Sequence, residues 1–177
     1  QDLQGDLYRR ISEKLVAIGY QHYEVSNYAR EGFRCHHNYG IWQGEDYLAL
    51  GPSAWGGLFF GSAKERTCFR RHNVPNLDKW LANKAPEIEK SSGFELFTEL
   101  ILTGLRTIDG IAWDGSWGRF FDKRISAAIM TERVPGLKYE AGRLKCENSQ
   151  WVYLDEITAR LLVLLEKELN GEDLMAP

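Results

Sequence analysis

The sequence predicts an α/β fold that is followed by a mainly helical, winged-helix-like C-terminal domain. Two observations lead to this prediction. Helix-period and strand-like segments alternate with very short connections in residues 1–62, as they do in α/β units built on a parallel sheet. Residues 93–177 instead contain helical segments, two strand-like runs and a last helix. Residues 63–92 connect the two parts.

The first predicted elements are a helix and a strand that follows it at once. Apolar residues recur there at helical spacing, namely Leu7, Ile11, Leu15 and Ile18. Gly19 stands where a glycine commonly ends a helix. The β-prone run "HYEVSNYA" at 22–29 predicts the strand. After a turn-rich stretch, the run "YLALGPSAWGG" at 47–57 predicts a second buried strand that ends in small residues.

The connecting segment carries weaker signals. We expect a short strand around 67–69 and a helix from Leu77, with Asn76 as its N-cap. Pro86 and the small polar residues after it predict a linker-like break at 86–93.

The C-terminal part begins with the longest amphipathic run, at 94–105. Two short helices are predicted next, at 116–121 and 124–130. A hairpin follows at 136–154, with its turn at 140–143. The last helix is predicted to start from Asp155 as N-cap and to end before Gly171.

Net charge, cysteine spacing and the lengths of apolar runs argue against several classes of protein. A net charge of −3 argues against a protein that coats nucleic acid. The three cysteines lie far apart in the sequence, which indicates a reducing, cytoplasmic setting rather than a disulfide framework. No apolar run approaches the ~20 residues that a membrane helix needs, so no stable membrane insertion is expected. The chain opens on a helix already under way, and we expect it to be part of a longer protein.

The stretch "CHHNYGIW" at 35–42 holds half of the four histidines and one of the three cysteines. As a zinc site it offers two ligands at most, where structural zinc wants four. A Cys–His nucleophile pair is weak, because sequence neighbours seldom have the facing geometry that base activation requires. Taken alone, the stretch favours a polar loop. The pattern "GPSAWGG" leaves two interpretations open: a ligand-binding strand end, or a glycine turn with Trp55 in the core.

A resemblance adds to these patterns. Residues 19–56 resemble the C-terminal part of radical S-adenosylmethionine proteins related to oxygen-independent coproporphyrinogen III oxidase, and most of all the HemW branch of haem chaperones. The matching pieces are "YEVSNYAR" at 23–30, "CHHN" at 35–38 and "YLALGPSA" at 47–54. Residues 94–111, "FELFTELILTGLRTIDGI", resemble a helix of the same family.

The resemblance implies a fold and cofactors. Family members have a partial (βα) barrel whose C-x-x-x-C-x-x-C motif holds a [4Fe–4S] cluster, and the cluster binds S-adenosylmethionine. This motif is absent from the sequence. The chain then corresponds to the last helix–strand units of the barrel, residues 1–62, and to the helical C-terminal domain. No catalytic residue is assigned to it, and radical chemistry would belong to the longer protein.

The resemblance also implies site residues. Residues beside S-adenosylmethionine would be Ser26, Asn27 and Ala29. Residues near the adenosyl group or the substrate would be Ser53, Ala54 and Trp55, of which Trp55 replaces a histidine common in HemW-like sequences.

The motif H-N-x-x-Y-W distinguishes the haem chaperone branch. His37, Asn38 and Trp42 match it, whereas Ile41 replaces the tyrosine. Because imidazole is a natural axial ligand of haem iron, the resemblance implies His37 as the ligand, His36 as a second candidate and Trp42 as a stacking wall.

The function implied is haem binding and transfer, with haem or porphyrin and haem-accepting proteins as partners. One alternative is that the longer protein is a coproporphyrinogen III oxidase that decarboxylates propionates. Another is a non-catalytic docking module that uses an exposed apolar stripe on the helix at 94–105. DNA binding by the winged-helix-like tail is disfavoured, because its candidate recognition helix is hardly basic.

Overall fold

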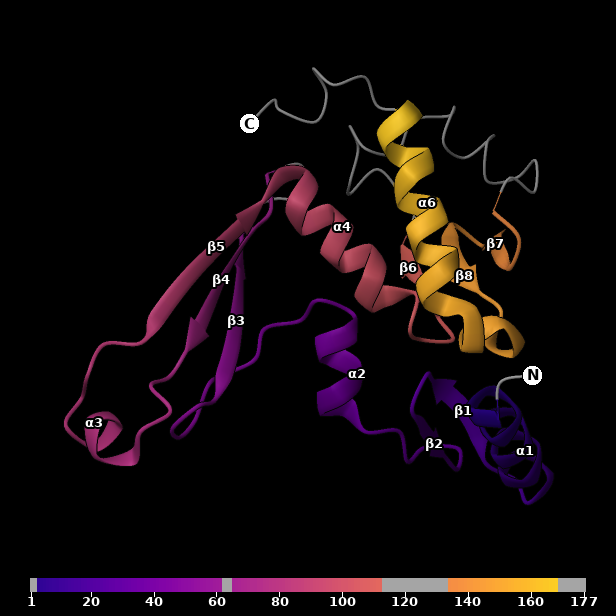
Figure 1. Cartoon of the computed structure of the whole chain (residues 1–177), viewed down its shortest axis with the longest axis horizontal. Helices are drawn as coiled ribbons and strands as arrows, with labels where there is room; N and C mark the ends of the chain where they lie inside the picture. Colours follow the sequence, from indigo (N-terminus) through magenta and orange to yellow (C-terminus); the bar gives the residue numbers. More distant parts are fainter. Residues whose placement is uncertain (1–2, 62–64, 113–133, 169–177) are drawn as a thin grey trace.

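The computed structural model describes residues 3–61, 65–112 and 134–168. It is a mixed α/β structure with three small sheets: a two-stranded sheet β1-β2 and three-stranded sheets β3-β4-β5 and β6-β8-β7. Figure 1 shows the sheet β3-β4-β5 on one side of α4 and the C-terminal elements on the other. Every strand pairing in these ranges is antiparallel. The predicted parallel sheet is therefore wrong for the described residues.

The N-terminal elements differ from the prediction in their strands. The helix is confirmed as α1 (Leu3–Ala17), and Gly19 has a φ of +89° just beyond it. The expected single strand is two, β1 (Gln21–Glu24) and β2 (Asn27–Ala29), which pair as a hairpin. Val25 and Ser26 form the turn between them, and the Val25 N–H donates to the Arg106 carbonyl at 2.8 Å.

The stretch that suggested a polar loop is a helix, α2 (His36–Trp42). The strand predicted at 47–57 is wrong over residues 48–54. Tyr47 forms only an isolated bridge to Gly57, and the strand β3 (Trp55–Phe60) overlaps the prediction in its last three residues. Two glycines allow this close approach: an added Cβ at Gly57 would lie 2.7 Å from the Tyr47 ring, and one at Gly56 would lie 2.6 Å from the Ala49 nitrogen.

The connecting segment contains more sheet than the sequence predicted. The expected strand is longer, β4 (Thr67–His72), and α3 (Leu77–Leu81) has the predicted cap, with the Asn76 side chain accepting from the Lys79 N–H. The predicted linker-like break is instead β5 (Glu87–Ser92), paired with β4 along its whole length. Its charged, small residues lack a strand pattern, and the strand is held by backbone pairing at a sheet edge.

The amphipathic helix is confirmed as α4 (Gly93–Gly104). It uses two faces: Phe97 and Ile101 lie in the main core, whereas Leu96 and Leu100 pack with Cys68 of the sheet β3-β4-β5. The helix therefore joins the two halves of the described structure. The predicted stripe offers no exposed docking surface, because Phe97, Ile101 and the following Leu105 are buried and Phe94 is half-buried against the same core.

The C-terminal elements are β6 (Ile111–Ala112), β7 (Leu137–Glu140), β8 (Arg143–Cys146), a 3-10 helix η2 (Asn148–Tyr153) and α6 (Leu154–Glu168). The hairpin turn is confirmed, with Glu140 opposite Arg143. The Asp155 cap is wrong: η2 runs directly into α6, so Asp155 lies in the helix. The predicted helices at 116–121 and 124–130, and Gly171, lie outside the described residues. The winged-helix arrangement stays a prediction.

The main core is built from α4, β8, η2 and α6. Trp151 of η2 is almost fully buried, and its indole N–H donates to the Leu105 carbonyl at 3.2 Å. Leu144 of β8 and Leu161 of α6 have no exposed surface. In the described ranges no helix has both the length and the apolar composition to cross a membrane.

We expect Ile101→Ala to lower the free energy of unfolding by about 2–5 kcal/mol, because the side chain is fully buried and its loss leaves a cavity. The control is Leu102→Ala, one position along α4, where the side chain is 38% exposed and the expected loss is under about 1 kcal/mol. Urea denaturation followed by circular dichroism measures both. Equal losses would contradict the assigned core.

Candidate functional site

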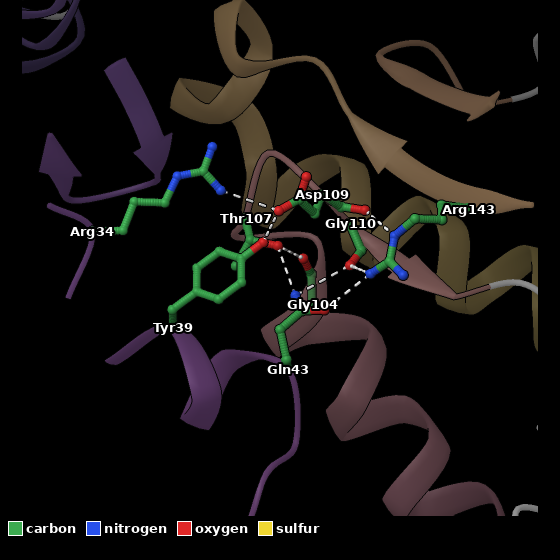
Figure 2. Close-up of polar contacts among 8 residues, drawn as sticks. All are labelled: Arg34, Tyr39, Gln43, Gly104, Thr107, Asp109, Gly110 and Arg143. Atoms are coloured by element: carbon green, nitrogen blue, oxygen red, sulfur yellow. Dashed lines mark hydrogen bonds and ion pairs between the residues drawn. The ribbon is translucent and has the colours of Figure 1, made fainter. Parts of the chain in front are cut away.

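The helix α2 is docked on the turn that follows α4. Figure 2 shows Tyr39 and Gln43, one helical turn apart, pointing at residues 107–110. The Tyr39 hydroxyl donates to the Asp109 carboxylate, which also pairs with Arg34 at 3.2 Å. The Gln43 side-chain amide donates to the Thr107 hydroxyl at 2.8 Å. The inner face of α2 is thus fixed by polar contacts.

A strand distant in the sequence completes this network. The Arg143 guanidinium of β8 donates to the Gln43 side-chain oxygen at 3.0 Å and to the Gly110 carbonyl at 2.9 Å (Figure 2). Gly110 has a φ of +60°, and a Cβ there would lie 2.1 Å from the Leu144 carbonyl oxygen. Glycine is therefore required at this position. Gln43 and Arg143 together connect α2, the turn and β8.

The pKa of the docked tyrosine, Tyr39, is raised. Burial raises the pKa of Tyr39 to about 12, and the hydrogen bond and negative charge of Asp109 act in the same direction. The phenol is a donor to the carboxylate only while it is protonated. Docking of α2 therefore depends on a neutral Tyr39.

The outer face of α2 presents the two histidines. His36, His37 and Asn38 are exposed. Within the described part of the chain, neither imidazole has a hydrogen-bond or ion-pair partner, so the ring nitrogens are available to an external ligand. The described residues contain no group of three or more metal-ligating side chains. The histidines can thus supply one ligand to a metal already held by another molecule.

The helical conformation of α2 separates His37 from Trp42, two residues of the same sequence motif. His37 and Ile41 are one turn apart and share a flank. Trp42 is five residues from His37, which corresponds to about 140° around the helix axis. Trp42 is half-buried, and the Arg106 guanidinium lies 5.2 Å from its ring centroid. Its indole nitrogen is buried and has no hydrogen-bond partner among the described residues. The structure therefore places Ile41, and not Trp42, beside His37.

The residues expected near S-adenosylmethionine lie on one hairpin. Ser26 is exposed at the turn between β1 and β2, Asn27 is half-buried and Ala29 is buried. On the neighbouring strand, Glu24 is fully buried, and neither of its carboxylate oxygens has a hydrogen-bond partner in the described structure. The hairpin thus contains an acceptor that a bound donor group could satisfy.

The second set of expected residues lies on a different sheet. Ser53, with a φ of +60°, and Ala54 precede β3, and Trp55 begins that strand. The Trp55 ring is stacked on His72 of β4, with a centroid distance of 4.2 Å and an interplanar angle of 7°. The His72 ring nitrogen lies 3.6 Å from the Glu87 carboxylate. An imidazole is thus stacked on the tryptophan that replaces the family histidine.

Sequence reasoning missed the residues that hold α2 in place: Gln43, Thr107, Asp109 and Arg143. A signal for three of them existed, because Gln43 lies in residues 19–56 and Thr107 and Asp109 lie in the stretch at 94–111, and both stretches resemble the family. Arg143 carried no such signal, since it is an ordinary charged residue until the fold joins it to Gln43.

The cysteines do not form a cluster site. Cys35 is exposed at the start of α2, whereas Cys68 and Cys146 are buried in separate core clusters. Burial raises the pKa of the Cys146 thiol to about 12, which disfavours the thiolate that a metal requires. The residues present therefore do not fit a [4Fe–4S] cluster, and the chain holds no step that depends on one.

Comparisons with known proteins find several relatives. Heme chaperone HemW of Synechocystis sp. is 35% identical over 62% of this chain. Heme chaperone HemW of Haemophilus influenzae is 33% identical over 44% of it. The mitochondrial radical S-adenosyl methionine domain-containing protein 1 of Mus musculus is 30% identical over 94% of it. No family model matches the chain, and no solved structure matches it.

These matches assign the chain to the class of radical S-adenosylmethionine proteins. Within that class the chain belongs with the HemW-like proteins, as the resemblance implied. It spans about a quarter of the length of the two bacterial relatives, 26% and 24%, and 40% of the mouse protein.

We expect Tyr39→Phe to lower the free energy of unfolding at pH 7 by about 1 kcal/mol, because Asp109 loses a hydrogen bond. A raised folded-state pKa favours the protonated phenol, so its contribution is full below about pH 10 and is lost as pH rises towards 12. The difference between wild type and Tyr39→Phe should therefore shrink over that range in urea denaturation.

Tyr139→Phe is the matched control, since Tyr139 is 41% exposed. This substitution should leave stability within about 0.5 kcal/mol of wild type at every pH. A constant difference between wild type and Tyr39→Phe up to pH 12 would contradict the docking contact.

Proposed function

We propose that the chain is the haem-binding part of a HemW-like haem-transfer protein, with His37 as an axial ligand of the haem iron. The observation that carries this proposal is the pair of exposed imidazoles on α2, to which no described residue is bonded. The opposite face of this helix is held by Tyr39 and Gln43. Relatives named heme chaperone HemW support the choice of haem.

The geometry suits haem better than a bare metal ion. Haem brings four nitrogen ligands of its own, so one imidazole from the protein is sufficient to hold the iron. A ligand helix held by packing and hydrogen bonds keeps its imidazole in a defined direction. Because His37 is exposed, the macrocycle can reach its imidazole. An acceptor protein can likewise reach the bound haem and remove it.

The residues that we propose around His37 have different roles from those that the sequence motif implied. Ile41, on the same flank, supplies an apolar contact to the macrocycle where the family has a tyrosine. His36 is a second candidate ligand from the adjacent position. Trp42 contributes to docking of α2 through Arg106 rather than as a wall beside the His37 ligand.

A role with S-adenosylmethionine is proposed for the longer protein, in which residues 1–62 would complete a partial (βα) barrel. When held by an iron–sulfur cluster, this cofactor supplies a 5′-deoxyadenosyl radical. The hairpin would contact it through Ser26, Asn27 and the backbone at Ala29, with the unpaired Glu24 carboxylate accepting from a cofactor N–H or O–H. Ser53, Ala54 and Trp55 would lie nearer the substrate.

The alternatives have less support. An oxidase reaction would also be a property of the longer protein, and the relatives named heme chaperone HemW favour haem transfer over it. The docking module was expected to use the stripe on α4, and that stripe is buried. We place the protein in the cytoplasm, where its free cysteines would stay reduced, with haem-accepting proteins as its partners.

We expect the full 177-residue chain to shift the Soret band of haemin on titration. His37→Ala should weaken binding by about tenfold or more, since an iron–imidazole bond is lost. Glu31→Ala is the control, because Glu31 is also exposed, lies in the loop before α2 outside the motif and carries no imidazole.

His36→Ala separates the two candidate ligands. Loss of the Soret shift in His36→Ala, with His37→Ala unchanged, would move the ligand to His36. An unchanged spectrum and affinity in both variants would reject haem ligation by α2.

A further inference from the structure

One face of the sheet β3-β4-β5 carries apolar side chains that are partly exposed to solvent. The face towards α4 is filled by Phe59 and Cys68. Side chains alternate along a strand, so their neighbours point to the opposite face. Four large apolar residues there are exposed by 38%, 55%, 38% and 57%: Leu58, Phe60, Phe69 and Ile88. Phe60 and Phe69 contact each other edge to face, at a centroid distance of 5.7 Å.

The same face continues into a cleft beside α3. Figure 1 shows α3 in the connection between β4 and β5, at the end of the sheet away from α4. Arg71, which lies opposite Ile88 on the apolar face, also lines this cleft. The other lining residues are Trp80, Leu81, Asn83, Lys84 and Pro86, and the volume is about 360 Å³. That volume is within the range of small-molecule sites.

The charges on this surface have one sign. Arg71 and Lys84 line the cleft, and Lys90 lies opposite Phe69 on the apolar face. None of the described residues that line the cleft carries a carboxylate, although the whole chain has a net charge of −3. The Arg71 Nε donates to the Asn73 side chain at 2.8 Å, and this amide partner is neutral, so it adds no negative charge to the surface. We call the face and the cleft together the basic apolar surface.

We infer that the basic apolar surface binds a planar apolar ring system that carries carboxylates, namely a porphyrin with free propionates. The exposed rings and aliphatic side chains contact the macrocycle, and Arg71 and Lys84 pair with the propionates. The residues that make up this surface include no histidine, cysteine, methionine or tyrosine. Binding there is therefore independent of iron, unlike binding at His37.

The choice of porphyrin rests on the proposed function, whereas the choice of a carboxylate-bearing ring rests on the surface itself. A ring with phosphates, such as a nucleotide, shares part of this chemistry. Metal-free protoporphyrin IX separates the two sites, because it has no iron for His37 to ligate. Its binding is read from its own fluorescence, and haemin binding is read separately from the Soret shift.

The experiment titrates the 177-residue chain with protoporphyrin IX, with its dimethyl ester and with ATP. We expect the ester to bind at least about tenfold more weakly than the diacid, since it cannot pair with the cations. Arg71→Glu/Lys84→Glu should raise the protoporphyrin dissociation constant by a similar factor. Arg10→Glu/Lys14→Glu on α1 makes the same change in net charge and should alter it by less than about twofold.

The comparison of the diacid with its dimethyl ester uses the wild-type chain, so the test stays decisive even if a variant fails to fold. Equal affinity for diacid and ester, or equal effects of the two charge-reversal variants, would overturn the inference. Tighter binding of ATP than of protoporphyrin would assign the surface to nucleotides and would overturn it as well. Loss of the haemin Soret shift with retained protoporphyrin binding would reject only the proposed function.

Discussion

Docking of α2 on the turn at 107–110 is the constraint on which the candidate site depends. A helix of seven residues has little stability of its own, because nucleation costs more than a few hydrogen bonds return. Its position comes from Tyr39, Gln43 and Arg143, which tie it to the turn and to β8. The outward direction of His37 follows from this inward attachment. A substitution far from the histidines can thus alter their presentation.

The helix α4 provides the second constraint, because one of its faces packs on the sheet β3-β4-β5 and another packs in the C-terminal core. Leu96 and Leu100 hold the sheet β3-β4-β5, while Phe97 and Ile101 hold the C-terminal core. Gly44, directly after α2, is in close contact with Leu100, on the covered face of that sheet. The C-terminal end of α2 therefore lies on the covered side of that sheet. Because His37 and the basic apolar surface share no residue, they can be altered separately, and iron-dependent and iron-independent porphyrin binding can be measured apart.

The helices with a clear apolar period, α1, α4 and α6, could be predicted from the sequence, and so could the tight hairpin turn before Arg143. The strands were harder. Tyr47 to Ala54 has a buried-strand composition, yet Gly56 and Gly57 let that segment cross β3 at a single bridge. At the site, His37 was predicted from the resemblance alone. Its separation from Trp42 follows from the helical state of 36–42, which the polar composition had not indicated.

The central claim is that a locked α2 presents His37 to the iron of haem. The most direct test is nitrogen NMR of the chain labelled at histidine ring nitrogens and titrated with zinc protoporphyrin IX, a diamagnetic analogue that takes one axial imidazole. The account predicts a large shift of a His37 ring nitrogen, while the buried His22 stays unchanged. Saturation with zinc protoporphyrin IX and no change at His37 would contradict it.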